Sequence, residues 1–164
     1  NPLKAEPGWP RVVVGGAYYT AINLMRNLVH RGLKTSCFDH GQNRQAFHTI
    51  YGKAFECPDP DREPAAWLQF MLELARKVGG KPVLIPSADA YVTAMARHAD
   101  ELAKAYIFCH ETVALQGLLA TKERQYDLAV EHGMPVPRTK FVRTVEEVIE
   151  FGSSAQFPCI IKPP

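Results

Sequence analysis

A short run of β-branched residues near the start of the chain restricts its fold more than any other feature. Residues 11–14 read Arg-Val-Val-Val and lead directly into Gly15-Gly16. A strand with one solvated face alternates apolar and polar residues, so this continuous run is typical of a strand buried on both faces. Such strands occur mainly in parallel sheets covered by helices on both sides. The run therefore favours an α/β fold.

The segments that follow continue an alternation of helices and strands. Apolar residues from Ile22 to Val29 have helical spacing, and Gly32 is the expected helix stop before a strand over 34–39. We expect a three-layer α/β/α sandwich with a parallel sheet from about 11 to 118, ordered 3-2-1-4, with room for a fifth strand. The other predicted strands are 54–57, 82–86 and 106–109, and the other predicted helices are 63–78 and 87–104, the latter capped by Ser87.

The organisation changes after about residue 118. We predict a short helix over 111–119, helices beginning at Thr121 and at Thr144, and strands near 140–142 and over 157–162. Thr144 and Glu147 form the sequence pattern of a capping box. The chain therefore reads as two domains, 1–118 and an incomplete 119–164. Because it lacks an initiator Met and stops after an apolar strand, we expect it to be part of a longer protein.

Composition excludes several classes of protein. The 164 residues are 46% hydrophobic, and 19 Lys plus Arg against 17 Asp plus Glu give a net charge of +2. The sequence shows no run of basic residues, so we expect no nucleic-acid partner. No apolar run approaches the roughly 20 residues that span a membrane, and no signal segment opens the chain. We expect a cytoplasmic protein with no membrane partner.

None of the four cysteines stands in a C-x-x-C pair, and three lie in short apolar runs. We expect buried, reduced, structural thiols. A zinc site is the alternative, but its spacing matches no usual ligand pattern, so we expect no bound metal. The cysteines are Cys37, Cys57, Cys109 and Cys159, and the alternative zinc ligands are Cys37, Asp39, His40 and His48.

The glycine turn after the first strand invites comparison with a dinucleotide-binding fingerprint. That fingerprint needs glycine at its first, third and sixth positions, which here hold Gly15, Ala17 and Thr20. Asp39, at the end of the second strand, stands where an acid would bind a ribose. One glycine and one acid are weak support, so we favour a structural turn over a nicotinamide site.

The carboxyl edge of a parallel sheet is where open α/β folds bind ligands. Two of the residues predicted there also have a purely structural explanation, because Ser87 is a good helix cap and Asp89 suits the helix dipole. The candidate substrate-binding residues are Gly15, Gly16, Tyr18, Tyr19, Ser87 and Asp89.

Two lysines, Lys122 and Lys162, are candidate anion-binding residues when they are considered together. Lys122 lies in the first turn of a predicted helix, an unfavourable place for a cation unless it helps free N–H groups to bind an anion. Lys162 ends the apolar run 157–162. Taken singly, each is explained as a surface lysine.

Their surroundings resemble the start of an ATP-grasp domain. The resemblance rests on Lys122, on the link GMPVPRT over 133–139 and on FPCIIKP over 157–163. The preceding segments, with 12–16 and the run VLIPSAD over 83–89, resemble the Rossmann-like pre-ATP-grasp domain. The chain looks closest to carboxylate–amine ligases of the D-aspartate ligase type.

The resemblance implies a ligase that activates a carboxylate with ATP and Mg²⁺ as an acyl phosphate, which an amine then attacks. Residues matching Lys122 and Lys162 contact the nucleotide in that family. The glycine-rich loop, the metal ligands and the catalytic arginine would follow residue 164, so no catalytic residue is expected within the chain, which alone would be inactive. The expected partners are ATP, a small carboxylate and an amine, and a homo-oligomer stays open. The alternatives are an NAD(P)-binding oxidoreductase domain and a non-catalytic substrate-binding or dimerisation domain.

Overall fold

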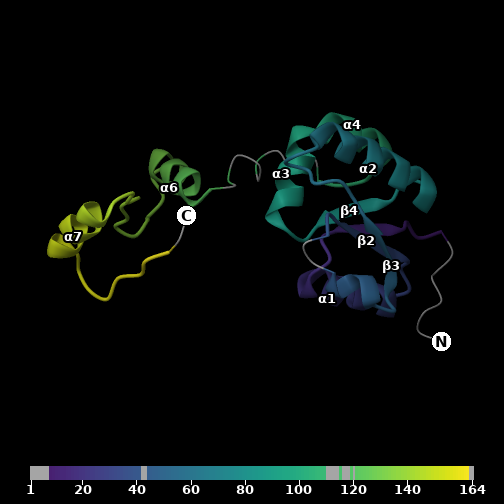
Figure 1. Cartoon of the computed structure of the whole chain (residues 1–164), viewed down its shortest axis with the longest axis horizontal. Helices are drawn as coiled ribbons and strands as arrows, with labels where there is room; N and C mark the ends of the chain where they lie inside the picture. Colours follow the sequence, from purple (N-terminus) through teal and green to yellow (C-terminus); the bar gives the residue numbers. More distant parts are fainter. Residues whose placement is uncertain (1–7, 42–43, 110–114, 116–118, 120, 163–164) are drawn as a thin grey trace. The chain divides into compact units, whose positions relative to one another are not determined.

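The chain divides into two compact units, residues 1–117 and 118–164. The computed structural model describes residues 8–41, 44–109, 115, 119 and 121–162. The first unit contains a parallel sheet between helices, and the second contains two helices joined by irregular segments (Figure 1). The two units are described separately below.

The sheet of the first unit has four parallel strands in the order β3-β2-β1-β4. The predicted order is therefore confirmed. Val13 of β1 stands opposite Ser36 of β2 on one side and opposite Leu84 of β4 on the other. Because β1 is paired along both edges and covered on both faces, all four of its residues are buried. The strands are β1 (Val12–Gly15), β2 (Thr35–Asp39), β3 (Gly52–Glu56) and β4 (Val83–Pro86).

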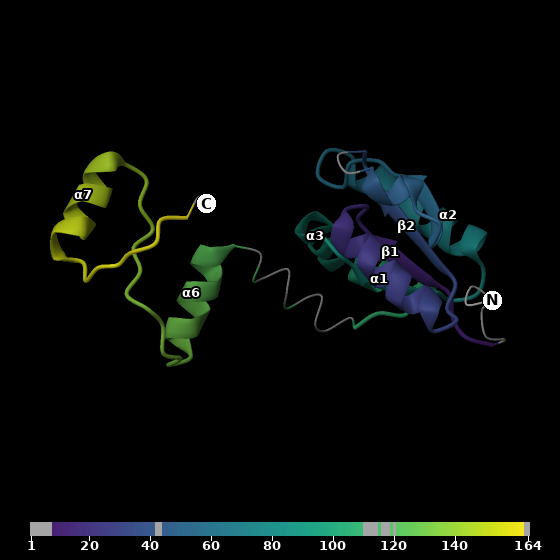
Figure 2. The same cartoon turned by 90° about the horizontal axis from the view of Figure 1, so that it is seen from below.

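Helices cover both faces of this sheet, which makes the predicted three-layer α/β/α sandwich (Figure 1). α1 (Tyr19–His30) lies along the face that Figure 2 views, and its Met25 packs in one cluster with Val12 and Val14. Val13 points to the opposite face because side chains alternate along a strand. The helices on that face are α2 (Pro64–Val78), α3 (Asp89–Arg97) and α4 (Ala99–Ala105).

Four details of the first unit differ from the sequence prediction. The predicted helix over 87–104 is two helices, which meet at His98. Ser87 does not cap α3, because its hydroxyl donates a hydrogen bond to the carbonyl oxygen of Gly15 instead. The predicted fifth strand is reduced to one parallel bridge between Val83 and Ile107. Between the predicted strands 34–39 and 54–57, the structure adds a short 3-10 helix, η1 (Gln45–His48), and β3 already begins at Gly52.

The second unit confirms the predicted helix starts but not the predicted strands. Thr121 caps α6 (Lys122–Glu131) by accepting from the Arg124 N–H, and Thr144 with Glu147 forms a capping box on α7 (Val145–Ser154). Residues 140–142 and 157–162 are irregular. A strand needs a neighbour to satisfy its backbone groups, and residues 121–162 contain none. Within the described residues the predicted strands of this unit are therefore not formed, and the predicted 111–119 helix lies mostly outside the described residues.

The cysteines divide into two classes. Cys37 and Cys57 are buried, whereas Cys109 and Cys159 are exposed, so the prediction of buried thiols is wrong for the latter two. The reason is that Cys109 follows the single bridge at Ile107 and Cys159 lies in the irregular segment. Burial, reinforced by the nearby Asp39 carboxylate, raises the pKa of Cys37 and Cys57 to about 12.

No helix in the described part of the chain has both the length and the apolar character needed to cross a membrane.

The difference between the thiols predicts their reactivity. The thiolate is the nucleophile, so an aromatic disulfide reagent at pH 8 should modify Cys109 and Cys159 quickly. Cys37 and Cys57 should react only after denaturation. Two fast equivalents out of four are expected in a thiol titration, and a Cys109→Ser, Cys159→Ser double variant should show none. Fast reaction of that double variant would contradict the burial described here.

Gly52 provides a test of the register of β3. A Cβ added there would collide with the carbonyl oxygen of Thr35 and would lie 2.6 Å from the Met25 Cε. Gly52→Ala should therefore lower the free energy of unfolding of the first unit by about 1–3 kcal/mol, the usual cost of overpacking. Denaturant unfolding followed by the fluorescence of buried Trp67 measures the change. Gly152→Ala is the control: its Cβ would meet no atom within 4 Å, and it should leave this transition unchanged.

Candidate functional site

The candidate site lies at the carboxyl edge of the sheet, where β1 and β4 end side by side. Gly15 stands opposite Pro86 in the register of this pair. The connection after β1 enters α1 on one face, and the connection after β4 enters α3 on the other. In open α/β sheets, ligands bind where successive connections diverge in this way. The structure thus brings together two predicted turns that are 72 residues apart in the sequence.

Two hydrogen bonds tie these turns to each other. The backbone N–H and the hydroxyl of Ser87 both donate to the carbonyl oxygen of Gly15, at 2.7 and 2.8 Å. The adjacent Gly16 has a φ of 117°, and a Cβ there would lie 2.6 Å from the Ser87 Oγ. Gly16 therefore meets a conformational and a steric requirement at once. Three of the predicted substrate-binding residues, Gly15, Gly16 and Ser87, shape the backbone at this point.

Tyr18 and Tyr19 form an exposed aromatic pair at the start of α1. Their ring centres are 4.8 Å apart, and the residues are 50% and 59% exposed. Tyr18 is the N-cap residue, but its side chain does not cap the helix, and the first turn of α1 contains no acidic residue. The first N–H groups of α1 therefore lack a side-chain partner at their N-cap and carry the positive end of the helix dipole. This arrangement suits an anionic group attached to a small organic molecule.

Asp89 begins α3 at the same edge. It is exposed, and it is the acidic residue of the first turn of that helix. Its carboxylate complements the α3 dipole, which is the structural role that the sequence suggested for it. An exposed carboxylate at this position is also accessible to a cationic group of a ligand.

Asp39 does not serve as the accessible acid that a ribose site would need. It is 2% exposed, and its two carboxylate oxygens accept hydrogen bonds from the N–H groups of Ala17 at 3.2 Å and Gly41 at 3.0 Å. The carboxylate thus joins the end of β2 to the glycine turn after β1. This burial removes the acid on which the dinucleotide interpretation depended.

The role of Tyr91 at this edge was not predicted from the sequence. Tyr91 of α3 is buried against Phe38, with ring centres 5.0 Å apart. Its hydroxyl accepts a hydrogen bond from the His40 N–H at 3.0 Å and lies 2.9 Å from the His40 Nδ1. Burial raises the pKa of Tyr91 above its ordinary value, so the phenol stays protonated at neutral pH. In sequence, Tyr91 was only one more apolar position of a helix.

The two predicted nucleotide-binding lysines both belong to the second unit and both are exposed. The Lys122 Nζ donates to the Gln125 Oε1 at 2.9 Å, so the ammonium lies over the first turn of α6. Lys162 follows Ile160 and Ile161, which are 82% and 80% exposed. Each side chain is accessible to an anion.

The described residues offer no metal centre. They include no group of three or more His, Cys, Asp or Glu side chains that could hold an ion. The zinc alternative fails at Asp39 in particular, because backbone N–H groups already occupy both of its oxygens.

The buried carboxylate of Asp39 predicts a specific cost of mutation. Asp39→Asn replaces one acceptor oxygen by an NH₂ group that would face a backbone N–H, so one buried donor loses its partner. The free energy of unfolding should fall by about 1–3 kcal/mol. Asp89→Asn, the same change at an exposed helix start, should cost only a few tenths of a kcal/mol. Equal losses in denaturant unfolding for the two variants would show that the Asp39 contacts do not stabilise the fold.

No protein-family model matches the chain. Among curated proteins, it is similar to a D-aspartate ligase from Enterococcus faecium (strain Aus0004), with 30% identity over 115 residues. The matched region covers 65% of this chain and 27% of that ligase. The match thus spans about a quarter of its relative's length, and its similarity is to a ligase.

Proposed function

We propose that this chain is part of an ATP-dependent ligase that joins a small carboxylate to an amine. The observation that carries the proposal is the 30% identity with a D-aspartate ligase over 115 residues. The sequence patterns around Lys122 and over 133–139 and 157–163, which resemble those of ATP-grasp domains, also support it. The parallel α/β sandwich of the first unit is compatible with a substrate-binding domain in such an enzyme.

We assign the carboxylate substrate to the carboxyl edge of β1 and β4. The N–H groups at the start of α1 would donate hydrogen bonds to its carboxylate, and Tyr18 and Tyr19 would flank it. An amino acid also carries an ammonium group, for which Asp89 is the accessible carboxylate. Gly15, Gly16 and Ser87 hold the two turns at the separation this site requires. D-Aspartate, named by the relative, has this combination of charges.

We assign the phosphates of ATP to Lys122 and Lys162. A lysine ammonium is a compact point charge that suits a polyphosphate. Mg²⁺ would neutralise phosphate charge in such a ligase, but the described residues contain no cluster of carboxylates to hold it. The proposal therefore locates the metal ligands in another part of the enzyme and derives no step through the metal.

The reaction has two steps. A carboxylate oxygen attacks the γ-phosphorus of ATP and the bond to ADP breaks, which leaves an acyl phosphate. The amine nitrogen then attacks the acyl carbon, phosphate departs, the nitrogen loses a proton and an amide remains. In this scheme residues 1–164 bind and orient the reactants, and the chain alone does not turn over.

The proposal predicts the effect of removing each lysine from the complete natural enzyme. With ATP, Mg²⁺, D-aspartate and an amine acceptor, Lys122→Ala and Lys162→Ala should each raise the apparent KM for ATP about tenfold or more. The reason is that each change removes a charge-assisted phosphate contact, worth about 1.5–3 kcal/mol. Acid- and amine-dependent release of ADP is the measurement, and Lys104→Ala, an exposed lysine of α4, is the control.

Two outcomes would contradict the assignment. If both variants match an active wild type, the lysines are ordinary surface residues. If ADP release does not depend on acid and amine, the ligase proposal is wrong. Calorimetry on this chain adds a separate test: Lys122 and Lys162 alone should bind ATP no better than about millimolar, because association entropy offsets two phosphate contacts. Micromolar binding of NAD or NADP would favour an oxidoreductase.

A further inference from the structure

A cavity of about 370 Å³ opens at the amino ends of β1, β2 and β3. This is the edge of the sheet opposite the turns of the candidate substrate site, and the whole cavity belongs to the first unit. Its volume lies within the range of small-molecule sites in proteins. Val29, Leu33 and Val78 contribute apolar surface to its lining, and Tyr51 and Phe55 contribute aromatic surface.

Four cations line this cavity, and they come from separate segments of the chain. Arg11 precedes β1, Lys34 precedes β2, Lys53 lies in β3 and Lys77 lies in the last turn of α2. All four are exposed, and the lining contains no Asp or Glu. Parallel pairing brings the starts of the three strands together, and α2 returns to the same edge. This arrangement creates a cluster of positive charges that the sequence alone does not reveal.

These cations have no acidic partners within the described residues. The ion pairs of the chain's described part involve Arg44, Arg62, Arg97 and Lys140, and none of the four cavity cations. Lys53 and Lys77 instead share one aromatic ring: their Nζ atoms lie 5.4 and 5.1 Å from the centre of Phe55. A ring face attracts a cation only weakly at an exposed site, so the two ammonium groups are not neutralised.

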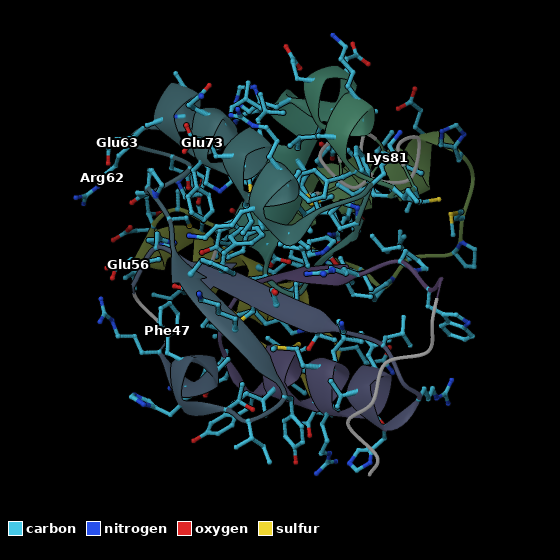
Figure 3. All side chains as sticks on the ribbon, turned by 90° about the vertical axis from the view of Figure 1, so that its right-hand side faces the viewer. Phe47, Glu56, Arg62, Glu63, Glu73 and Lys81 are labelled. Carbon is cyan, nitrogen blue, oxygen red and sulfur yellow. The ribbon has the colours of Figure 1, made fainter. Side chains whose placement is uncertain are left out.

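Carboxylates of β3 and α2 have other partners. In α2, Glu73 accepts a hydrogen bond from the Gln69 Nε2 at 3.1 Å. Glu56, at the opposite end of β3, pairs with Arg44 at 2.7 Å. Figure 3 shows Glu56 and Glu63 on one side of the view and Lys81, which precedes β4, on the other. Like charges gathered around one opening repel each other, and none of the described residues that line this cavity is acidic. An anion from solution would remove this repulsion.

We propose that this cavity binds a small anion that carries phosphate and at least two negative charges. Three lysines supply point charges, and Arg11 supplies a planar fork that matches two phosphate oxygens. The apolar and aromatic walls leave room for an organic group beside the phosphate. Because the site lies at the amino edge of the sheet, it is separate from the carboxylate site, and it does not depend on the ligase proposal.

Pyrophosphate is a suitable probe, because it has the charge without an organic group. Calorimetry with the whole chain at low salt should show saturable binding that weakens as salt is added, since salt screens exposed charges. A Lys53→Gln, Lys77→Gln double variant should bind about tenfold or more weakly, because two charge-assisted contacts are lost. Chemical-shift changes on titration should centre on residues 34–36, 51–55 and 77–78.

Matched variants separate this site from general electrostatics and from the proposed ATP site. Lys81→Gln removes a charge near the same edge but outside the cavity lining, and Lys122→Gln, Lys162→Gln removes the pair in the second unit. At pyrophosphate concentrations well below about 1 mM both should bind as the wild type does, because the lysine pair of the second unit alone is expected to bind phosphate no better than that. Equal weakening by Lys81→Gln, or full affinity in the Lys53→Gln, Lys77→Gln variant with an unchanged unfolding midpoint, would overturn the proposal. Loss confined to the Lys122→Gln, Lys162→Gln variant would move binding to the second unit and overturn it too.

Discussion

The first unit depends on the complete burial of β1. This strand is paired along both edges and packed on both faces, so a change at any of its positions affects two layers at once. Val12 and Val14 organise the cluster under α1, and Val13 organises the cluster under α2, α3 and α4. Because the strand is held on all sides, the glycine turn that follows it is also held in place. The candidate substrate site is built on this turn.

The end of β1 also determines which polar groups are left for a ligand. The Gly15 carbonyl oxygen accepts hydrogen bonds from Ser87. The Gly16 N–H donates to the Phe38 carbonyl oxygen, and the Ala17 N–H donates to the Asp39 carboxylate. The carbonyl oxygen of Gly15 and the N–H groups of Gly16 and Ala17 therefore already have partners within the protein. The first N–H groups of α1 are different, because Tyr18 has no side chain that caps them. The start of α1, beside two exposed tyrosines, is therefore where we propose that this edge binds an anion.

The two ends of the same sheet offer different chemistry. At the carboxyl edge, the α1 dipole supplies partial positive charge and Asp89 supplies one full negative charge, a combination that suits a small zwitterion. At the amino edge, the four cations Arg11, Lys34, Lys53 and Lys77 supply full charges around a cavity. If both proposals hold, a phosphate-bearing anion at one end would bind to the same rigid strands that position the substrate at the other. The distance along the strands separates the two ligands, so each site can be tested by its own variants.

Local patterns determined much of this protein from the sequence alone. The valine run, the helical spacing before Gly32 and the caps at Thr121 and Thr144 act within a few residues, and all were confirmed. Ser87 shows the limit of such patterns. A serine before a helix usually caps it, but here the Ser87 hydroxyl donates a hydrogen bond to the Gly15 carbonyl oxygen, 72 residues away in the sequence. The burial of Asp39 and the four cations around one cavity have the same origin. Parallel pairing brings distant strand ends together, and only the tertiary structure specifies which side chains then become neighbours.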